Sequence, residues 1–251
     1  MKLLNSFFLV FVFAVIIYGC KKSSTMQTMY YGNAVAIGSG SMKSWIQTDN
    51  NGKPISLGFT INEAAIAALP STDTMYMLMM PMMTGGMSGM SMPSPFDHLE
   101  VSWAPNGDAG STIFNHPHLD CHFYTITSSA QMGIMMGMDT AMIGANYLPQ
   151  NCMADSEAEA NMGVHVYDTL SPEYHGSTFD HSFMYGFYHG NMTFIEVMCA
   201  KSFLDTKTNY TGSIAQPAAF KQTGYYPLKY TVSYNASTKE YSYSLDNLTS
   251  H

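Results

Sequence analysis

The chain has 251 residues, with 10 lysines against 18 acidic residues and no arginine, so its formal net charge is −8 at neutral pH. An acidic chain without arginine lacks the positive field and the bidentate donors that phosphate backbones require, which argues against a nucleic-acid partner. The length is enough for one sizeable hydrophobic core, and no shift in composition divides it into two domains.

Residues 1–19 predict a signal peptide that is removed from the mature protein. An apolar run from Phe7 to Tyr18 ends at Gly19 and Cys20. The run is shorter than the ~20 apolar residues of a bilayer-spanning helix, and a small residue before a cysteine is what lipoprotein-processing enzymes read. We expect Cys20 to become the lipidated amino terminus of a bacterial lipoprotein, at the outer membrane facing the periplasm. Plain secretion is the alternative, because the residues before Gly19 depart from the usual pattern.

The mature chain is expected to be a tether followed by one β-rich domain. Removal of residues 1–19 leaves 9 lysines against 18 acids, a net charge of −9. Residues 20–29 are polar and read as a tether. Residues 30–251 are predicted to form the single domain. Because lipid at Cys20 would link it to the membrane, an envelope protein is a candidate partner. The oligomeric state stays open.

The first part of that domain predicts strands and one short helix. Strands are expected within 30–48 and at 55–61, on either side of a turn at 49–52. Asn62 is expected to cap a helix from Glu63 to Leu69, which Pro70 ends.

Methionine is concentrated in residues 75–92, which contain nine of the 23 methionines. Glycines make the second half of this segment a predicted loop. Soft thioether sulfur selects Cu(I), so a copper-handling loop is one hypothesis, and the methionines of residues 132–142 resemble it. The alternative is packing, because Met75, Met77 and Met79 alternate as core side chains do. The candidate copper ligands are Met87, Met90 and Met92.

Apolar and polar residues alternate with a period of two in several segments of the rest of the chain, which predicts strands. Residues 128–162 read as loop, with one helical turn at 155–160. We therefore expect an all-β fold, a sandwich or barrel of short antiparallel strands with one or two short helices. The expected strands are 96–103, 116–127 and 163–168, followed by hairpins within 181–199 and 228–245.

The register of the 181–199 hairpin bears on the candidate site. If His189 and Gly190 form its two-residue loop, Phe183 faces Glu196 and His181 faces Met198. That register would place His181 and Glu196 on one face as diagonal neighbours.

Residues 116–124 contain the most informative pattern. On a strand, His118, Asp120 and His122 share one face, while Leu119, Cys121 and Phe123 share the other. Two imidazoles four residues apart are about 13 Å apart along a strand, so neighbouring strands are the better source of further ligands. We expect a divalent metal site, with zinc, iron, nickel or copper as candidate ions. The expected ligands are His118, His122, His165 and Glu196, with Asp120 and His181 hydrogen-bonded to them from outside.

Other interpretations of these residues stay open. They could form a buried hydrogen-bonded network in a purely structural, protein-binding domain. A metal with an open coordination position could activate water, as in a hydrolase, but no common enzyme motif is present and catalysis is left undecided. The pairing of Cys121, Cys152 and Cys199 is also open, since three thiols allow at most one disulfide.

Five motifs occur in order along the domain: PFDHLEVSW, PHLDCHFYTI, MGVHVYD, FDHSFMYGFYHGNMTFIEVM and GYYPLKYTVSY. With these motifs the chain resembles a bacterial extracytoplasmic family of unknown function, typified by a thermophile protein under an envelope-stress sigma factor of the sigma-E type. The resemblance runs from about Tyr30 to about Leu248. It implies a β-rich fold and an envelope location, in keeping with a binding or stress-response module, but no established activity. This chain departs from the family pattern at Cys121 and in the methionine-rich segment.

Overall fold

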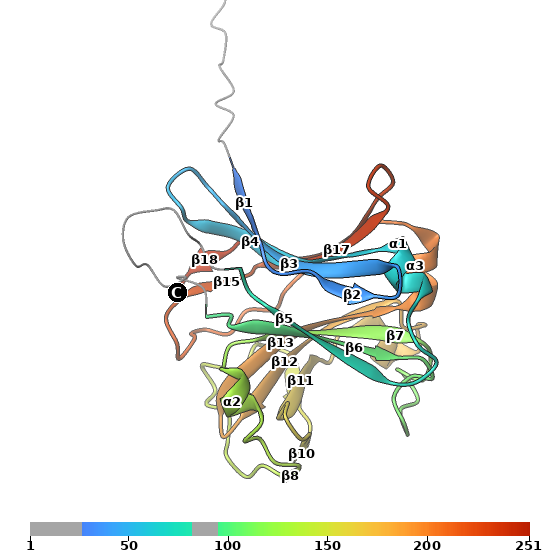
Figure 1. Cartoon of the computed structure of the whole chain (residues 1–251). Helices are drawn as coiled ribbons and strands as arrows, with labels where there is room; N and C mark the ends of the chain where they lie inside the picture. Colours follow the sequence, from blue (N-terminus) through green and yellow to red (C-terminus); the bar gives the residue numbers. More distant parts are fainter. Residues whose placement is uncertain (1–26, 82–94) are drawn as a thin grey trace, which may run out of the picture.

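The computed structural model describes residues 27–81 and 95–251, and in them the chain forms two antiparallel sheets that face each other (Figure 1). One sheet, called sheet A, runs in the order β1-β3-β4-β17-β16-β14, with β2 paired to β3. Its strands are β1 (Thr28–Tyr31), β2 (Val35–Ile37), β3 (Gly40–Thr48), β4 (Pro54–Asn62), β14 (Tyr210–Ser213), β16 (Lys229–Asn235) and β17 (Glu240–Asp246).

The second sheet, sheet B, runs in the order β5-β6-β7-β13-β12-β11-β9. Because β13 pairs with β7, segments that are far apart in the sequence lie side by side at its centre. Its strands are β5 (Thr74–Met79), β6 (His98–Ala104), β7 (His118–Tyr124), β9 (Cys152–Ala154), β11 (Val164–Asp168), β12 (His181–Tyr188) and β13 (Asn191–Ala200).

Shorter elements complete the described chain. Two small ribbons pair β8 (Gly137–Met138) with β10 (Glu157–Ala158) and β15 (Tyr225–Tyr226) with β18 (Thr249–Ser250). The helices are α1 (Glu63–Ala67), α2 (Ser128–Gln131) and α3 (Lys201–Thr206), with a 3-10 turn at Pro172–His175. No helix within 27–81 or 95–251 combines the length and apolarity needed to cross a bilayer.

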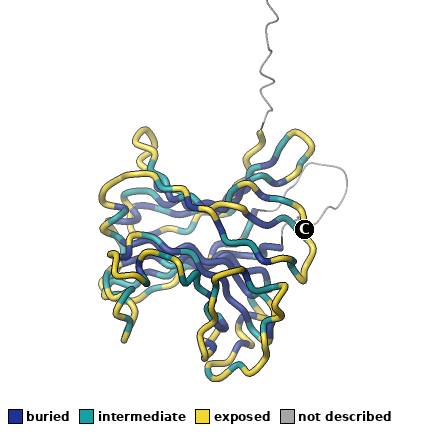
Figure 2. The backbone as a smooth tube through the Cα atoms, turned by 180° about the vertical axis from the view of Figure 1, so that it is seen from behind, coloured by how far each residue is buried: buried dark blue, intermediate teal, exposed yellow. Residues whose placement is uncertain are grey.

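The hydrophobic core lies between the two sheets. Figure 2 shows in dark blue the buried residues along the strands of both sheets. The inward side chains of β7 are Leu119, Cys121 and Phe123, all fully buried, so the predicted alternation of this strand is confirmed. The opposite face of sheet B, called here the outer face, carries His118, Asp120 and His122. The all-β class is confirmed, and the arrangement is a sandwich.

Some local predictions are confirmed and others are wrong. Asn62 caps α1 by accepting a hydrogen bond from the backbone N–H of Ala65. The helical turn expected at 155–160 is wrong, because this segment contributes β10, and α2 forms instead where Thr127 caps its first turn. The three cysteines of the described chain are free thiols.

The alternative interpretation, in which Met75, Met77 and Met79 pack in the core, is also wrong. The three side chains are exposed on β5, while the intervening Leu78 is buried. Alternation identifies the two faces of a strand, but it does not say which face the partner sheet covers.

The predicted register of the 181–199 hairpin is wrong by one residue. Tyr188 faces Asn191 as expected, but a β-bulge follows, and Phe183 faces Val197 while His181 faces Cys199. The extra residue in β13 moves His181 to the core face of sheet B, opposite to the face of Glu196.

Candidate functional site

A row of buried ionisable side chains crosses the centre of the outer face. In the strand register, His122 of β7 lies directly opposite Glu100 of β6 on one side and Glu196 of β13 on the other. Each of the three is only 2% exposed. Alternation places them on the outer face, and the loops beyond sheet B bury them there.

His165 joins this row from β11, although β12 lies between β11 and β13. The residue of β12 that pairs with His165 is Gly186, which has no side chain. On its other side, Gly186 pairs with Phe194 of β13. A Cβ atom at Gly186 would lie 2.1 Å from the Phe194 ring, so only glycine leaves room for it. The ring packs against the imidazoles of both His122 and His165.

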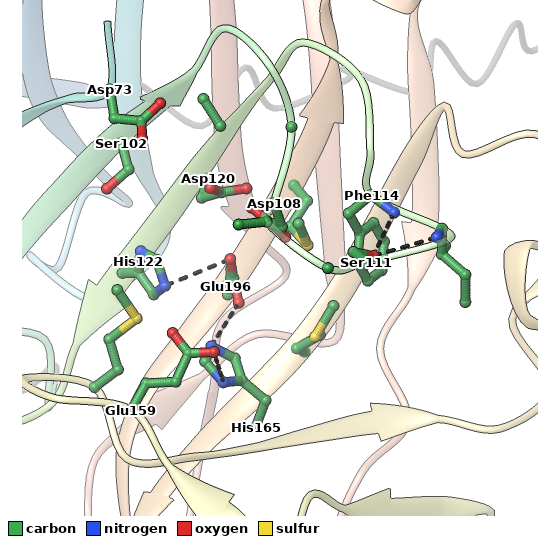
Figure 3. Close-up of a pocket in the computed structure, with 18 of the residues that line it drawn as sticks. Asp73, Ser102, Asp108, Ser111, Phe114, Asp120, His122, Glu159, His165 and Glu196 are labelled. Carbon is green, nitrogen blue, oxygen red and sulfur yellow. Dashed lines mark hydrogen bonds and ion pairs between the residues drawn. The ribbon is translucent and has the colours of Figure 1, made fainter. Parts of the chain in front are cut away.

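Glu196 lies between the two imidazoles. Its Oε1 is 3.4 Å from Nε2 of His122, and its Oε2 is 3.6 Å from Nε2 of His165. The three candidate ligand atoms lie within 4.8 Å of one another, and Figure 3 shows the side chains converging. We call this group the His122–His165–Glu196 cluster.

Burial leaves polar atoms of this cluster without hydrogen bonds. Neither ring nitrogen of His122 has a hydrogen-bond partner, and Oε2 of Glu196 has none. Such atoms cost free energy in a folded protein unless something else binds them. Burial, with the nearby His165, lowers the pKa of His122 to about 3, and burial raises the pKa of Glu196 well above its usual value. His122 is therefore neutral at physiological pH, as a metal ligand must be.

Two further carboxylates lie on the outer sides of the imidazoles. Glu159 Oε1 is 3.9 Å from Nδ1 of His165. Glu100 faces His122 in the register, Gln131 of α2 donates a hydrogen bond to its Oε2 at 2.8 Å, and its Oε1 has no partner. Each imidazole therefore has Glu196 on one side and a second carboxylate on the other. From that position the second carboxylate could orient a metal-bound histidine.

The cluster lines a pocket of about 840 Å³ on the outer face of sheet B. The lining includes six carboxylates, two histidines and three buried or partly buried methionines, but no lysine or arginine. His118 lies beside two of these carboxylates, but no lysine or arginine lies among the six, so the pocket favours a bound cation. The acidic residues are Asp73, Asp108, Asp120, Asp155, Glu159 and Glu196.

His118 does not join the cluster, although we expected it to be a ligand together with His122, His165 and Glu196. Its Nε2 lies 3.1 Å from Asp120 and 3.3 Å from Asp108, and these three form a separate group. Burial opposes a charge on His118, but the carboxylates of Asp108 and Asp120 beside it raise its pKa to about 10, so the protonated ring pairs with them at neutral pH. Asp120, which we expected to support the whole ligand set, contacts His118, and His118 lies outside the cluster.

His181 is separated from the cluster by sheet B itself. On the core side it stacks on Tyr210, with ring centroids 3.4 Å apart, and Tyr230 is hydrogen-bonded to its Nδ1. It lines a second pocket, of about 360 Å³. Its expected role beside Glu196 is therefore wrong, and the β-bulge in β13 is the reason.

The remaining expected sites lie outside the described residues. They are Cys20, for lipidation, and Met87, Met90 and Met92, for copper.

Sequence reasoning missed Glu100 and Asp108. Glu100 carried a signal, because it alternates with Leu99 and Val101 and so belongs to the outer face. Asp108 carried none, since it lies in the loop between β6 and β7, where Gly107 adopts a φ of 73° and backbone atoms of Asn115 and His116 leave no room for a Cβ.

The comparisons with known proteins agree with the resemblance over part of the chain. The model of the TTHB210-like family, described as hypothetical protein TTHB210, matches residues 49–103. That segment is 55 of the 251 residues and includes the first quoted motif, while the His122–His165–Glu196 cluster lies outside it. Neither the comparison with curated proteins nor the one with solved structures finds a match.

Proposed function

We propose that this protein binds a divalent transition-metal ion through His122, His165 and Glu196. Two imidazoles and one carboxylate are a donor set that suits zinc, iron, nickel or copper. The observation that carries the proposal is the buried His122, whose two ring nitrogens lack hydrogen bonds while Glu196 and His165 converge beside it. Three protein ligands leave a coordination position open toward the pocket, where a small molecule or water can bind.

We also propose that the protein works in the bacterial envelope as a binding or stress-response module. The support is the apolar segment that ends at Gly19-Cys20, followed by a polar tether. Mass spectrometry of the amino terminus tests this: we expect a diacylglyceryl group on Cys20, absent after Cys20→Ser. An unmodified chain that begins before Cys20 would contradict it.

Metal content tests the first proposal. We would purify the full-length chain in detergent and measure bound metals by elemental analysis. We expect close to one equivalent of a transition metal in the unsubstituted protein and its loss in His165→Ala and Glu196→Gln. The matched control is His175→Ala, an exposed histidine outside the pocket. Equal metal content in all variants, or none after reconstitution with Zn²⁺, would contradict the proposal.

Copper handling is a second candidate, because the exposed large apolar side chains of the described chain are mostly methionine. Ten of these 13 side chains are methionines, and thioether sulfur prefers Cu(I). Copper retained by His165→Ala but lost on changing Met87, Met90 and Met92 together would favour this candidate. The exposed methionines are Met29, Met75, Met77, Met79, Met132, Met135, Met136, Met138, Met142 and Met153.

A further inference from the structure

We propose a second cation site in the same pocket, formed by Asp108, His118 and Asp120. It goes beyond the proposed function, because none of its three donors belongs to the His122–His165–Glu196 cluster. The two carboxylates line the pocket, and Figure 3 shows them next to each other beside Glu196.

The geometry brings three ligand atoms together. His118 Nε2 is 3.3 Å from Oδ1 of Asp108 and 3.1 Å from Oδ1 of Asp120, and the group lies within the 4.8 Å that one ion can span. Asp108 is held over the outer face by its loop, in which its backbone N–H donates to the Phe114 carbonyl at 2.8 Å.

His118 directs its Nε2 at the two carboxylates at ion-pair distance, without a hydrogen bond of acceptable geometry. The side chain is fully buried, and its Nδ1 donates to the His116 carbonyl at 2.7 Å, which leaves Nε2 directed at the two carboxylates. Neither His118 Nε2 nor Asp120 Oδ1 has a hydrogen-bond partner of acceptable geometry. The rings of Phe114 and Phe179 pack edge-on against the imidazole, so its Nε2 faces the two carboxylates in an otherwise apolar surrounding.

The donor chemistry differs between the two sites. The first offers two nitrogens and one oxygen, whereas the second offers one nitrogen and two charged oxygens. Oxygen-rich sets suit harder cations, so the expected ion here is of the Mn²⁺ class. In the metal-free protein the protonated His118 offsets part of the charge of Asp108 and Asp120, and a divalent cation would replace that proton, since the pocket lining offers no lysine or arginine.

The test uses the full-length chain, stripped of metal and loaded with one equivalent of Zn²⁺. Zn²⁺ binds nitrogen-containing sites more tightly than Mn²⁺ does, so it fills the first site. Mn²⁺ is then titrated and its free concentration is followed by electron paramagnetic resonance. We expect one equivalent of Mn²⁺ to bind, with affinity at least about tenfold lower in Asp108→Asn, by analogy with the loss of other metal-site partners.

Asp108 is suited to this test, because its side chain is 43% exposed and its removal leaves the core untouched. Asp73→Asn, a change to another acidic residue of the lining, is the matched control and should bind Mn²⁺ normally. His118→Gln is a second variant that should also lose Mn²⁺.

The outcomes separate the two proposals. Mn²⁺ binding that is unchanged in Asp108→Asn, or absent from the unsubstituted protein, overturns the second site. This holds even if Asp108→Asn lowers the melting temperature, because a loss of stability alone is not evidence of Mn²⁺ binding. If Zn²⁺ is then still lost in His165→Ala, the first site stands alone. If Mn²⁺ binds but Zn²⁺ is retained by His165→Ala, the second site stands and the first fails.

Discussion

Glu100 faces His122 in the strand register, and Glu159 lies 3.9 Å from Nδ1 of His165. Each carboxylate could therefore orient one of the two imidazoles that we propose as metal ligands. Loss of such a partner typically costs 10–100-fold in metal affinity. We expect Glu100→Gln and Glu159→Gln to weaken Zn²⁺ binding, with the larger effect at Glu100, because it is buried and Glu159 is exposed. Competition with a chromophoric chelator measures the affinity.

Glu157 provides the control for these variants, since it is exposed on β10 and lies outside the pocket lining. Glu157→Gln should bind Zn²⁺ like the unsubstituted protein. Unchanged affinity in Glu100→Gln would mean that His122 is oriented without Glu100.

His181 should make the stability of the fold sensitive to acid. Burial lowers its pKa below the usual 6.5, against the opposing charge of Asp180, while Tyr210 and Tyr230 pack on the ring. Because the folded state holds the proton less tightly than the unfolded state, this contribution is present above pH 6.5 and is lost as the pH falls through the folded pKa.

Urea denaturation of His181→Gln at several pH values tests this expectation. At pH 7 we expect the variant to be less stable by about 1 kcal/mol, mainly through the lost ring stacking. The difference should shrink toward pH 5, since only the unsubstituted protein then loses the His181 contribution. A difference that stays constant from pH 7 to 5, with His175→Gln as control, would contradict the assigned cause.

At the scale of the strands, His165 reaches the cluster across β12 because Gly186 has no side chain in between. Because a Cβ there would lie 2.1 Å from the Phe194 ring, Gly186→Ala must displace the ring toward the imidazoles. We expect a loss of about 1–3 kcal/mol in the free energy of unfolding, the usual cost of overpacking, and weaker Zn²⁺ binding. Urea denaturation and chelator competition measure the two effects.

Gly133→Ala is the control, because its Cβ would meet nothing closer than 3.3 Å and the residue is exposed. Adding Phe194→Leu to Gly186→Ala should recover part of the stability by removing the ring. If Gly186→Ala alone behaves like Gly133→Ala, the close contact does not constrain the fold.

The strands also show what could be predicted from the sequence. Alternation alone places His122 and Glu196 correctly, because each lies in a long strand whose other face is apolar. It fails at His181, since the β-bulge that follows Gly186 adds a residue without a mark in the local pattern. It also fails for His118. His118 and His122 share one face of β7, and only the loop that carries Asp108 determines that His118 pairs with carboxylates outside the cluster.

For the molecule as a whole, the site and the hydrophobic core are on opposite faces of sheet B. The core lies between the sheets, whereas the side chains of the proposed ligands line the pocket on the other face of sheet B. The metal-free protein should therefore fold, and a metal should add stability by binding only the folded state. This differs from small metal-dependent domains that unfold without their ion.

Zn²⁺ at a free concentration 100 times its dissociation constant should add about 2.7 kcal/mol to the free energy of unfolding. A chain of this size gains about 2–4 °C per kcal/mol, so we expect the melting temperature to rise by about 5–10 °C. Calorimetry with and without a chelator measures the rise, which should be absent in His165→Ala. An equal rise in that variant would show that Zn²⁺ stabilises the protein through the general acidity of the pocket, because His165 would then contribute no specific coordination.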